Sequence, residues 1–365
     1  MTRLHEHQSD LGSGLNKTIA VIEGDDAAPE AVRPVVALLD SLQLGLTWVF
    51  PEVGEVEESK EGSTFPDSAR AVIDAADTTL FGSTSGKSGA ALGYLRWGKE
   101  TFANVRPCRY LPGCASPLRH PEGIDFVIVR ENLEDLYVGA EGPLTDLAAL
   151  NVVGRTIRKP VHELGDGRYA IKAITREGTE RVVRFAFDLA ARRGGKRKLT
   201  CATKHNMLRT TDGLFLDVAR EVAGDYPDIE FESFIVDDFA CRMIREPERF
   251  DVAVMPNQYG DILSDAAGGL LGSLGLAASG CFGADYAYFE PAHGTAPDIA
   301  GRNVINPTAT LLSTTMMLDY LGLETAAARI EDALARVYAD GSVLTPDQGG
   351  TATTTEFCAA LARAL

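Results

Sequence analysis

Two aspartates in the stretch 260–265 (GDILSD) have the type and spacing of ligands for a divalent cation. The stretch follows a predicted apolar strand over 251–255, and we expect a helix there with Asp261 and Asp265 one turn apart. Carboxylates at this spacing share a helix face, and hard divalent cations prefer their oxygens. An aspartate at a helix start is more often only a cap, but ligand sites in α/β sheets gather at the carboxyl ends of strands. The stretch therefore predicts a metal site.

Arg96, Arg106, Arg109 and Arg130 lie close together in the sequence of a strongly acidic chain. Guanidinium groups bind carboxylates through two parallel hydrogen bonds. A single arginine is about as often a surface residue, but several of these stand near the ends of predicted helices and strands. Next to a metal site they predict a small di- or tricarboxylate substrate.

Tyr137, Lys204 and Asp237 each follow a predicted apolar strand. Side chains at the rim of a sheet are well placed to transfer protons to a substrate, and an aspartate there is a candidate to complete the metal site. Alone, each residue type is more often structural. Their functional interpretation depends on the paired aspartates and the arginines.

The segment 290–299 (EPAHGTAPDI) is a loop with prolines, a glycine, and acidic and imidazole side chains. It lacks the G-x-G-x-x-G fingerprint of a Rossmann dinucleotide site. The stretch 82–88 (GSTSGKS) also differs from a phosphate-binding loop, because three residues separate its glycines where that motif has four. An acidic residue in 290–299 is suited to the ribose hydroxyls of NAD and would repel the additional phosphate of NADP.

Short apolar runs alternate with helical patterns along the chain, which is typical of an α/β protein with a largely parallel sheet. The elements that must position the candidate residues are strands predicted over 18–23, 79–81, 126–129, 199–203, 231–236 and 251–255, and helices predicted over 29–42, 180–193, 306–320 and 324–338.

The chain has 365 residues and a formal net charge of −17, so its overall field repels nucleic acid and anionic membranes. The basic run 192–198 (RRGGKRK) is expected to end a helix rather than bind nucleic acid. Six scattered cysteines without a Cys-x-x-Cys pair indicate reduced, buried thiols in the cytoplasm. Residues 1–16 are polar, which predicts a loose tail and no signal peptide, and the uncharged stretch 266–284 predicts a packed helix and loop.

At these residues the chain resembles the β-decarboxylating dehydrogenases that act on isocitrate, homoisocitrate, 3-isopropylmalate, and tartrate or D-malate. The resemblance extends from about residue 18 to the C-terminus, in the order that the family shows. The blocks that carry it are ANVRPCRY (103–110), FVIVRENLEDLYVG (126–139), RFDVAVMPNQYGDILSD (249–265) and EPAHGTAPDIAGRNVINPTA (290–309).

The resemblance implies that Tyr137 and Lys204 are catalytic and that Asp237, Asp261 and Asp265 bind Mg²⁺ or Mn²⁺. It implies that Arg96, Arg106 and Arg130 clamp the carboxylates of a small 2-hydroxy di- or tricarboxylate, with Leu92 in the same pocket. The pair Asp298-Ile299 is similar to the NAD-using branch of the family. The residues that the resemblance implies for NAD binding are Glu290, His293, Gly294, Ala296, Asp298, Ile299 and Asn306. It also places Asp347 in the same region.

The resemblance also implies an isopropylmalate dehydrogenase-like α/β fold that is not a Rossmann fold. A large domain would comprise 17–101 and 272–365, and a smaller domain over 102–271 would carry substrate and metal residues and form a homodimer. Lys204 and Asp237 would enter the site from the other subunit, so that the active sites are shared.

The implied reaction is the oxidative decarboxylation of a 3-substituted (R)-malate with reduction of NAD⁺. The sequence departs from the family where the substrate is chosen, because 89–95 (GAALGYL) lacks the Ser-x-Asn pattern of isocitrate enzymes. Leu92 is similar to the apolar pocket of isopropylmalate enzymes, Gly93 leaves a gap, and Tyr94 or Lys87 is a candidate to meet a distal carboxylate.

Two further alternatives stay open. The substrate alternatives are homoisocitrate and tartrate or D-malate, and the alternative of a different class is a non-catalytic regulatory subunit. The turn 24–28 (GDDAA) also departs from the family's glycine-containing turn.

Overall fold

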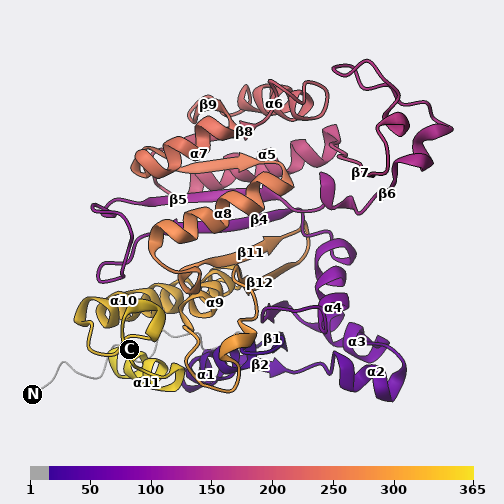
Figure 1. Ribbon diagram of the computed structural model, residues 1–365. Coiled ribbons are helices and arrows are strands. Elements are labelled where there is room, and N and C mark those ends of the chain that lie inside the picture. The colour runs from indigo at the N-terminus through magenta and orange to yellow at the C-terminus, as the bar shows by residue number, and fades with distance from the viewer. Residues whose placement is uncertain (1–15) are drawn as a thin grey trace, which may run out of the picture.

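The computed structural model describes residues 16–365, so the predicted tail lies outside the described residues except for Asn16. Its centre is a ten-stranded mixed sheet (Figure 1). Across the sheet the strands are β2 (Leu46–Val49), β1 (Lys17–Ile22), β3 (Thr78–Phe81), β12 (Ala287–Pro291), β11 (Ala278–Phe282), β4 (Ala103–Arg109), β5 (Asp125–Glu131), β10 (Val252–Met255), β8 (Lys198–Thr203) and β9 (Glu230–Ile235).

Two parallel groups of strands meet through an antiparallel middle. The group β2, β1, β3 and β12 is parallel, and so is the group β5, β10, β8 and β9. Strands β11 and β4 pair antiparallel to their neighbours and join the two groups into one sheet. This order differs from the parallel strand order of a Rossmann fold, so the prediction of an α/β fold that is not a Rossmann fold is confirmed. The predicted domain boundaries stay a prediction.

Helices cover both faces of the sheet. Helices α5 and α6 pack on one face of the group that contains β5 and β10, and α7 and α8 pack on its other face. Helices α1, α9, α10 and α11 pack together beside the group that contains β1 and β12. Their bounds are α1 (Ala28–Ser41), α2 (Glu55–Glu61), α3 (Asp67–Ala75), α4 (Gly89–Gly93), α5 (Arg176–Arg192), α6 (Thr211–Ala223), α7 (Val236–Arg245), α8 (Asn257–Leu271), α9 (Thr308–Tyr320), α10 (Glu324–Asp340) and α11 (Thr354–Ala364).

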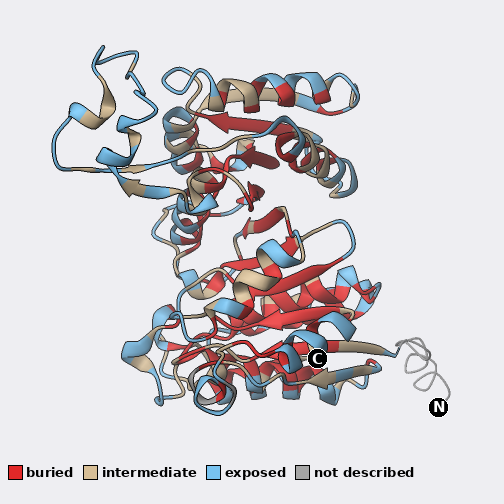
Figure 2. Cartoon of the chain, turned by 90° about the vertical axis from the view of Figure 1, so that its right-hand side faces the viewer, coloured by how far each residue is buried: buried red, intermediate tan, exposed pale blue. Residues whose placement is uncertain are grey.

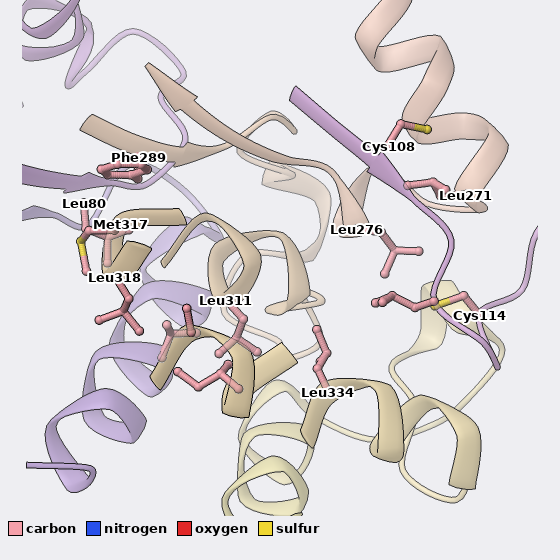
Figure 3. Packing of buried hydrophobic residues seen from close by; sticks show 14 of the residues in the cluster. Leu80, Cys108, Cys114, Leu271, Leu276, Phe289, Leu311, Met317, Leu318 and Leu334 are labelled. Carbon is pink, nitrogen blue, oxygen red and sulfur yellow. The ribbon is translucent and has the colours of Figure 1, made fainter. Parts of the chain in front are cut away.

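Strand β5 shows why the predicted apolar runs form central strands. Phe126 and Ile128 pack into the core beneath α8, and Val127 and Val129 pack into the core beneath α5. A strand buried on both faces has an unbroken apolar run, as here. The larger of these cores continues to Leu80 and Phe289 in the other part of the sheet and to Leu311 of helix α9 (Figure 3).

A strand was expected near Arg106, but the bounds of β4 were not predicted, because Pro107 interrupts its pattern. Proline lacks the N–H that a sheet ladder needs. Strand β11 pairs with β4 only as far as Val105, so Pro107 lies where one edge of β4 is free. The stretch 266–284, expected as a helix and a loop, also contains β11, and no described helix is long and apolar enough to cross a membrane.

A two-stranded arm, β6 (Glu141–Pro143) and β7 (Arg168–Ala170), projects from the sheet (Figure 1). Its surroundings are mostly exposed or half-buried (Figure 2). Leu150 and Leu164 are exposed over 73% and 56% of their surface, and Val152, Val153 and Ile157 of the same segment are also exposed. The arm therefore presents apolar surface to its exterior.

The fold pairs cations of the basic run 192–198 with acidic residues and leaves the cysteines as thiols. Arg193 forms ion pairs with Asp125 and Asp251, and Lys198 pairs with two glutamates of β9, so these cations are partly neutralised within the fold. All six cysteines are free thiols as expected. The expectation that all are buried is wrong for Cys241, which is exposed because it lies on the outer side of α7.

Candidate active site

Helix α8 presents the paired aspartates. The chain passes from β10 through Pro256 directly into α8, which begins at Asn257 rather than at Asp261. Gly260 allows the helix to lie against β5, since a Cβ at this position would come within 2.6 Å of the Cβ of Arg130. Asp261 and Asp265 consequently lie one turn apart beside the buried arginines of the sheet.

Arg130 is held from two sides at the end of β5. Its Nε donates a 2.7 Å hydrogen bond to Oδ1 of Asn257, and its Nη1 forms a close ion pair with Asp261. The side chain is 2% exposed. Burial and the neighbouring Arg106 lower the pKa of Arg130 to about 10, so the group stays charged at neutral pH.

Arg106 reaches the same carboxylates from β4. Its Nη1 donates to Oδ1 of Asp265 at 3.1 Å and to Oγ of Ser264 at 3.1 Å. Its Nε donates to Oδ1 of Asn104 at 3.2 Å. Asn104, Ser264 and Asn257 were not recognised as site residues, because single polar residues within β4 and α8 carry no sequence signal until their partners are known.

Arg96 has unsatisfied hydrogen-bonding capacity. It lies in a π-helical turn, Tyr94–Gly98, and among the described residues its buried Nε has no hydrogen-bond partner. Burial disfavours its charge, but Tyr288 and Glu290 outweigh this effect and raise the pKa of Arg96. A permanently charged guanidinium with a free donor fits a carboxylate ligand.

These groups share one cavity of about 220 Å³. It is lined by Ser83, Thr84, Leu92, Arg96, Arg106, Arg130, Tyr137, Asp261, Glu290, Pro291, Ala292 and His293. The predicted substrate residues therefore come together. Glu290, predicted on the cofactor side, lies instead beside the arginines, because the strand β12 carries it under the cavity. Arg109 lies elsewhere and pairs with Glu331.

Tyr137 stands at the mouth of the same cavity. Its hydroxyl donates a 3.0 Å hydrogen bond to Oδ2 of Asp261, and the guanidinium carbon of Arg130 is 5.4 Å from its ring centroid. Burial, with Asp261 as a second cause, raises the pKa of Tyr137 above its ordinary value. The hydroxyl is therefore protonated at neutral pH and is suited to donate a proton.

Lys204 and Asp237 lie apart from the paired aspartates in this chain. They contact each other, with Nζ and Oδ1 2.5 Å apart, and the hydrogen bond from Lys204 lowers the pKa of Asp237. Within residues 16–365, no three acidic, histidine or cysteine side chains lie close enough together to hold a metal ion. One chain thus supplies two of the three predicted metal ligands at one place.

The donor set fits a hard divalent cation. Asp261 and Asp265 offer carboxylate oxygens from side chains that are 35% and 48% exposed, which leaves room for further ligands. Burial raises the pKa of Asp265 although Arg106 opposes this effect. A bound cation would favour the ionised form of both groups.

A second, more apolar cavity of about 420 Å³ adjoins the first through His293. Predicted cofactor residues that line it are His293, Gly294, Ala296, Ile299 and Asn306, whereas Asp298 is exposed beside it. Asn306 donates to Asp347 at 3.0 Å. Burial lowers the pKa of His293, and among the described residues its buried Nε2 has no partner. A neutral imidazole with an unsatisfied nitrogen fits a polar cofactor group.

The glycine loop 82–88 wraps around a carboxylate of the protein itself. Asp25 accepts hydrogen bonds from the Ser85 amide at 2.8 Å and from Oγ of Ser88 at 3.1 Å. Burial opposes ionisation, but the hydrogen bonds from the loop outweigh it and lower the pKa of Asp25. The departure at residues 24–28 therefore has a structural role, with Asp26 in the left-handed region at φ 54° and bonded to Thr295 at 2.6 Å.

The substrate-side predictions are partly corrected. Leu92 lines the first cavity, and a Cβ at Gly93 would meet no atom within 4 Å, which agrees with a gap. The prediction that Tyr94 meets a distal carboxylate is wrong. Its hydroxyl donates to Asp74 at 2.5 Å, and its ring packs against Phe65, so the side chain points away from the cavity.

Comparison with known proteins agrees with this architecture. The family model described as "Isocitrate/isopropylmalate dehydrogenase" matches residues 18–361. A 3-isopropylmalate dehydrogenase of Methanothermobacter thermautotrophicus is 40% identical over 347 residues, which cover 95% of this chain and 98% of that one. An isocitrate/homoisocitrate dehydrogenase of Thermus thermophilus is 41% identical over 353 residues, with 95% and 98% covered. The crystal structure of isocitrate dehydrogenase from Methylococcus capsulatus has a TM-score of 0.81 at 35% identity and covers 95% of this chain and 99% of that one.

Proposed function

Because the chain belongs to the isocitrate and isopropylmalate dehydrogenase family, we propose that it oxidises and decarboxylates a 3-substituted (R)-malate with NAD⁺ as the hydride acceptor. The observation that carries this proposal is the convergence of three arginines, Asp261 and Tyr137 on one small cavity. Arginines can bind the carboxylates of the substrate through two hydrogen bonds each. Nε of Arg96 in particular is a donor without a partner among the described residues.

The metal ion and NAD⁺ would each supply one kind of chemistry when bound. A divalent cation held by Asp261 and Asp265 would stabilise negative charge on substrate oxygens, and NAD⁺ would accept the hydride. The chain's own residues bind the substrate between the arginines and transfer its protons. Lys204, which the other subunit would bring to the cavity, takes the proton of the C2 hydroxyl while the C2 hydrogen leaves with its electron pair.

Tyr137 completes the reaction. After oxidation the bond from C3 to its carboxylate breaks, CO₂ leaves, and the electron pair remains on the enolate formed from C3, C2 and the C2 oxygen. Tyr137, whose raised pKa keeps its proton at neutral pH, then protonates C3. Turnover of a panel of 3-substituted malates with NAD⁺ and Mn²⁺, followed as reduced cofactor, tests the whole proposal, and inactivity on every member would overturn it.

We propose a homodimer with shared sites for the same reaction. Lys204 and Asp237 pair with each other away from Asp261 and Asp265, so another copy is needed to bring a lysine to the cavity. The arm around β6 and β7 exposes the apolar side chains Leu150 and Leu164, which such an interface would cover. We also propose a cytoplasmic location, because the six cysteines are free thiols.

NAD⁺ is expected to exceed NADP⁺ by at least about tenfold in kcat/KM, a difference of roughly 1.4 kcal/mol. The reason is Asp298, an exposed carboxylate beside the second cavity, which would accept ribose hydroxyls and repel a 2′-phosphate. Initial rates with each cofactor measure the ratio, and Asp298→Asn should narrow it. Equal efficiency with NADP⁺ would refute the assignment.

Gly93→Leu is expected to reduce kcat/KM most for substrates with bulky third substituents. Gly93 follows Leu92, which lines the cavity, and no atom lies within 4 Å of a Cβ built at Gly93, so we propose that a larger side chain there fits the fold and narrows the space for the third substituent. Overpacking costs about 1–3 kcal/mol. The substrate panel measures the change, with D-malate as the small-substrate control. An equal loss on all substrates would show that Gly93 does not face the third substituent.

A further inference from the structure

Lys172 is a buried cation between two buried carboxylates. Its Nζ lies 2.7 Å from Oδ1 of Asp212 and 3.3 Å from Oδ1 of Asp135. The lysine side chain is 11% exposed and both aspartates are 0% exposed. The ammonium also lies 4.4 Å from the ring centroid of Tyr259. Buried charges are costly unless paired, so the three groups depend on one another for their places.

The two carboxylates hold the main chain next to both proposed proton-transfer residues. Asp135 Oδ1 accepts a 2.8 Å hydrogen bond from the amide of Leu136, the residue before Tyr137. Asp212 Oδ2 accepts a 2.7 Å hydrogen bond from the amide of Lys204 itself. The main chain at Lys204, and the main chain one residue before Tyr137, are thus each held by a carboxylate bound to Lys172.

The same network reaches the helix that bears the paired aspartates. Asp135 Oδ2 accepts a 3.0 Å hydrogen bond from the amide of Gln258 in the first turn of α8. Tyr259, the next residue, contacts the ammonium of Lys172. The start of α8 is therefore tied to the loop of Tyr137 through one carboxylate.

The backbone at Asp135 needs such support. It lies in the left-handed region at φ 72°, which is unfavourable for a residue with a side chain. A β-bridge joins it to Ala173, the residue after Lys172. The β-bridge to Ala173 therefore holds the main chain of Asp135 in this strained conformation, and Lys172 holds its side chain.

We propose that Lys172 is a positioning residue that, through Asp135 and Asp212, holds Tyr137 and the start of α8 for the site of its own subunit and Lys204 for the site of the other subunit. This inference rests on the proposed function for the roles of Tyr137 and Lys204. Lys172 acts through these carboxylates and takes no part in proton transfer. Because small displacements of reacting groups cost large factors in rate, its loss should lower kcat more than it raises KM.

The chain offers a matched control. Lys198 is 12% exposed and also pairs with two carboxylates, Glu230 at 3.1 Å and Glu232 at 3.0 Å. Those carboxylates are on β9 and hold neither catalytic residue. Lys172→Met and Lys198→Met thus remove the same charge from lysines of similar exposure, although the glutamates around Lys198 are 67% and 18% exposed, and only the first removes the tie to Tyr137 and Lys204.

Lys172→Met is expected to lower kcat by about tenfold to a hundredfold with KM for the hydroxy acid changed less than about threefold, and Lys172→Arg is expected to restore most of the loss. Lys198→Met should leave kcat within about twofold. In a Tyr137→Phe background the effect of Lys172→Met should shrink, because residues that act together are not additive. A folded Lys172→Met enzyme with unchanged kcat, or an equal loss in both backgrounds, overturns the proposal.

Hydrogen–deuterium exchange provides a readout that needs no activity. Peptides containing Leu136 and Lys204 should exchange at least about tenfold faster in Lys172→Met and at the wild-type rate in Lys198→Met. If Lys172→Met does not fold, Asp212→Asn, which weakens the acceptor for the Lys204 amide, should give faster exchange at Lys204. Unchanged exchange at Lys204 would show that Asp212 does not hold this amide. An inactive wild-type chain with the expected exchange pattern overturns the proposed function but supports the positioning role.

Discussion

Asp261→Asn is expected to lower kcat by at least about a hundredfold, the loss typical when one electrostatic stabiliser of a transition state is removed. Asp261 is the group on which the site converges, since it contacts Arg130, Arg106 and Tyr137. Removing its charge removes a cation ligand and the partner of the Tyr137 hydroxyl at once. Steady-state rates on the best malate of the panel measure the loss.

The metal and the fold provide separate controls for this variant. A chelator should abolish wild-type activity and added Mn²⁺ should restore it, while Mn²⁺ should raise the thermal midpoint of the wild type and not of Asp261→Asn. Asp217→Asn is the matched substitution, because Asp217 is an exposed aspartate of α6 that pairs with Arg220 at 3.5 Å and lies outside the predicted metal site. Full activity in excess chelator would refute the metal site.

Mixed dimers of two inactive variants are expected to recover about a quarter of wild-type activity. Tyr137→Phe and Lys204→Met should each lose about a hundredfold or more, as removal of a general acid or base does. If each site takes Tyr137 from one subunit and Lys204 from the other, a heterodimer of the two variants has one intact site of two. Random pairing makes about half of the dimers hetero, which gives the quarter.

The matched control is a mixture of Tyr137→Phe with Asp261→Asn. These two side chains contact each other within one chain at 3.0 Å, so no pairing of these variants leaves an intact site and no activity should return. Co-expression with different tags separates the heterodimers for assay. Absence of recovery in the first mixture, with heterodimers present, would show that the sites are not shared in this way.

Sequence reasoning located the groups of the site whose spacing is local. Asp261 and Asp265 share a helix face by their spacing alone, and Arg130 ends an apolar strand, so both positions were accessible from patterns. The α/β class followed in the same way from alternating runs. These inferences depend on periodicity, which is a property of a short stretch of chain.

The remaining features depend on partners far apart in the sequence. Tyr94 was expected at the substrate, but Asp74, which lies 20 residues earlier, draws its hydroxyl away. The glycine loop binds the carboxylate of Asp25, which lies 60 residues before Ser85. Strand β11 contains glycine and serine, and its place in the sheet is set by β4 and β12 rather than by its own propensity.

The uninterrupted sheet has a mechanical consequence for the cavity between its two groups of strands. Arg106 on β4 and Glu290 on β12 both line the cavity, and β11 pairs with both strands. Backbone hydrogen bonds of β11 connect the strands that carry these two residues. A change in the separation of Arg106 and Glu290 would therefore require a change in the twist of β4, β11 and β12 together.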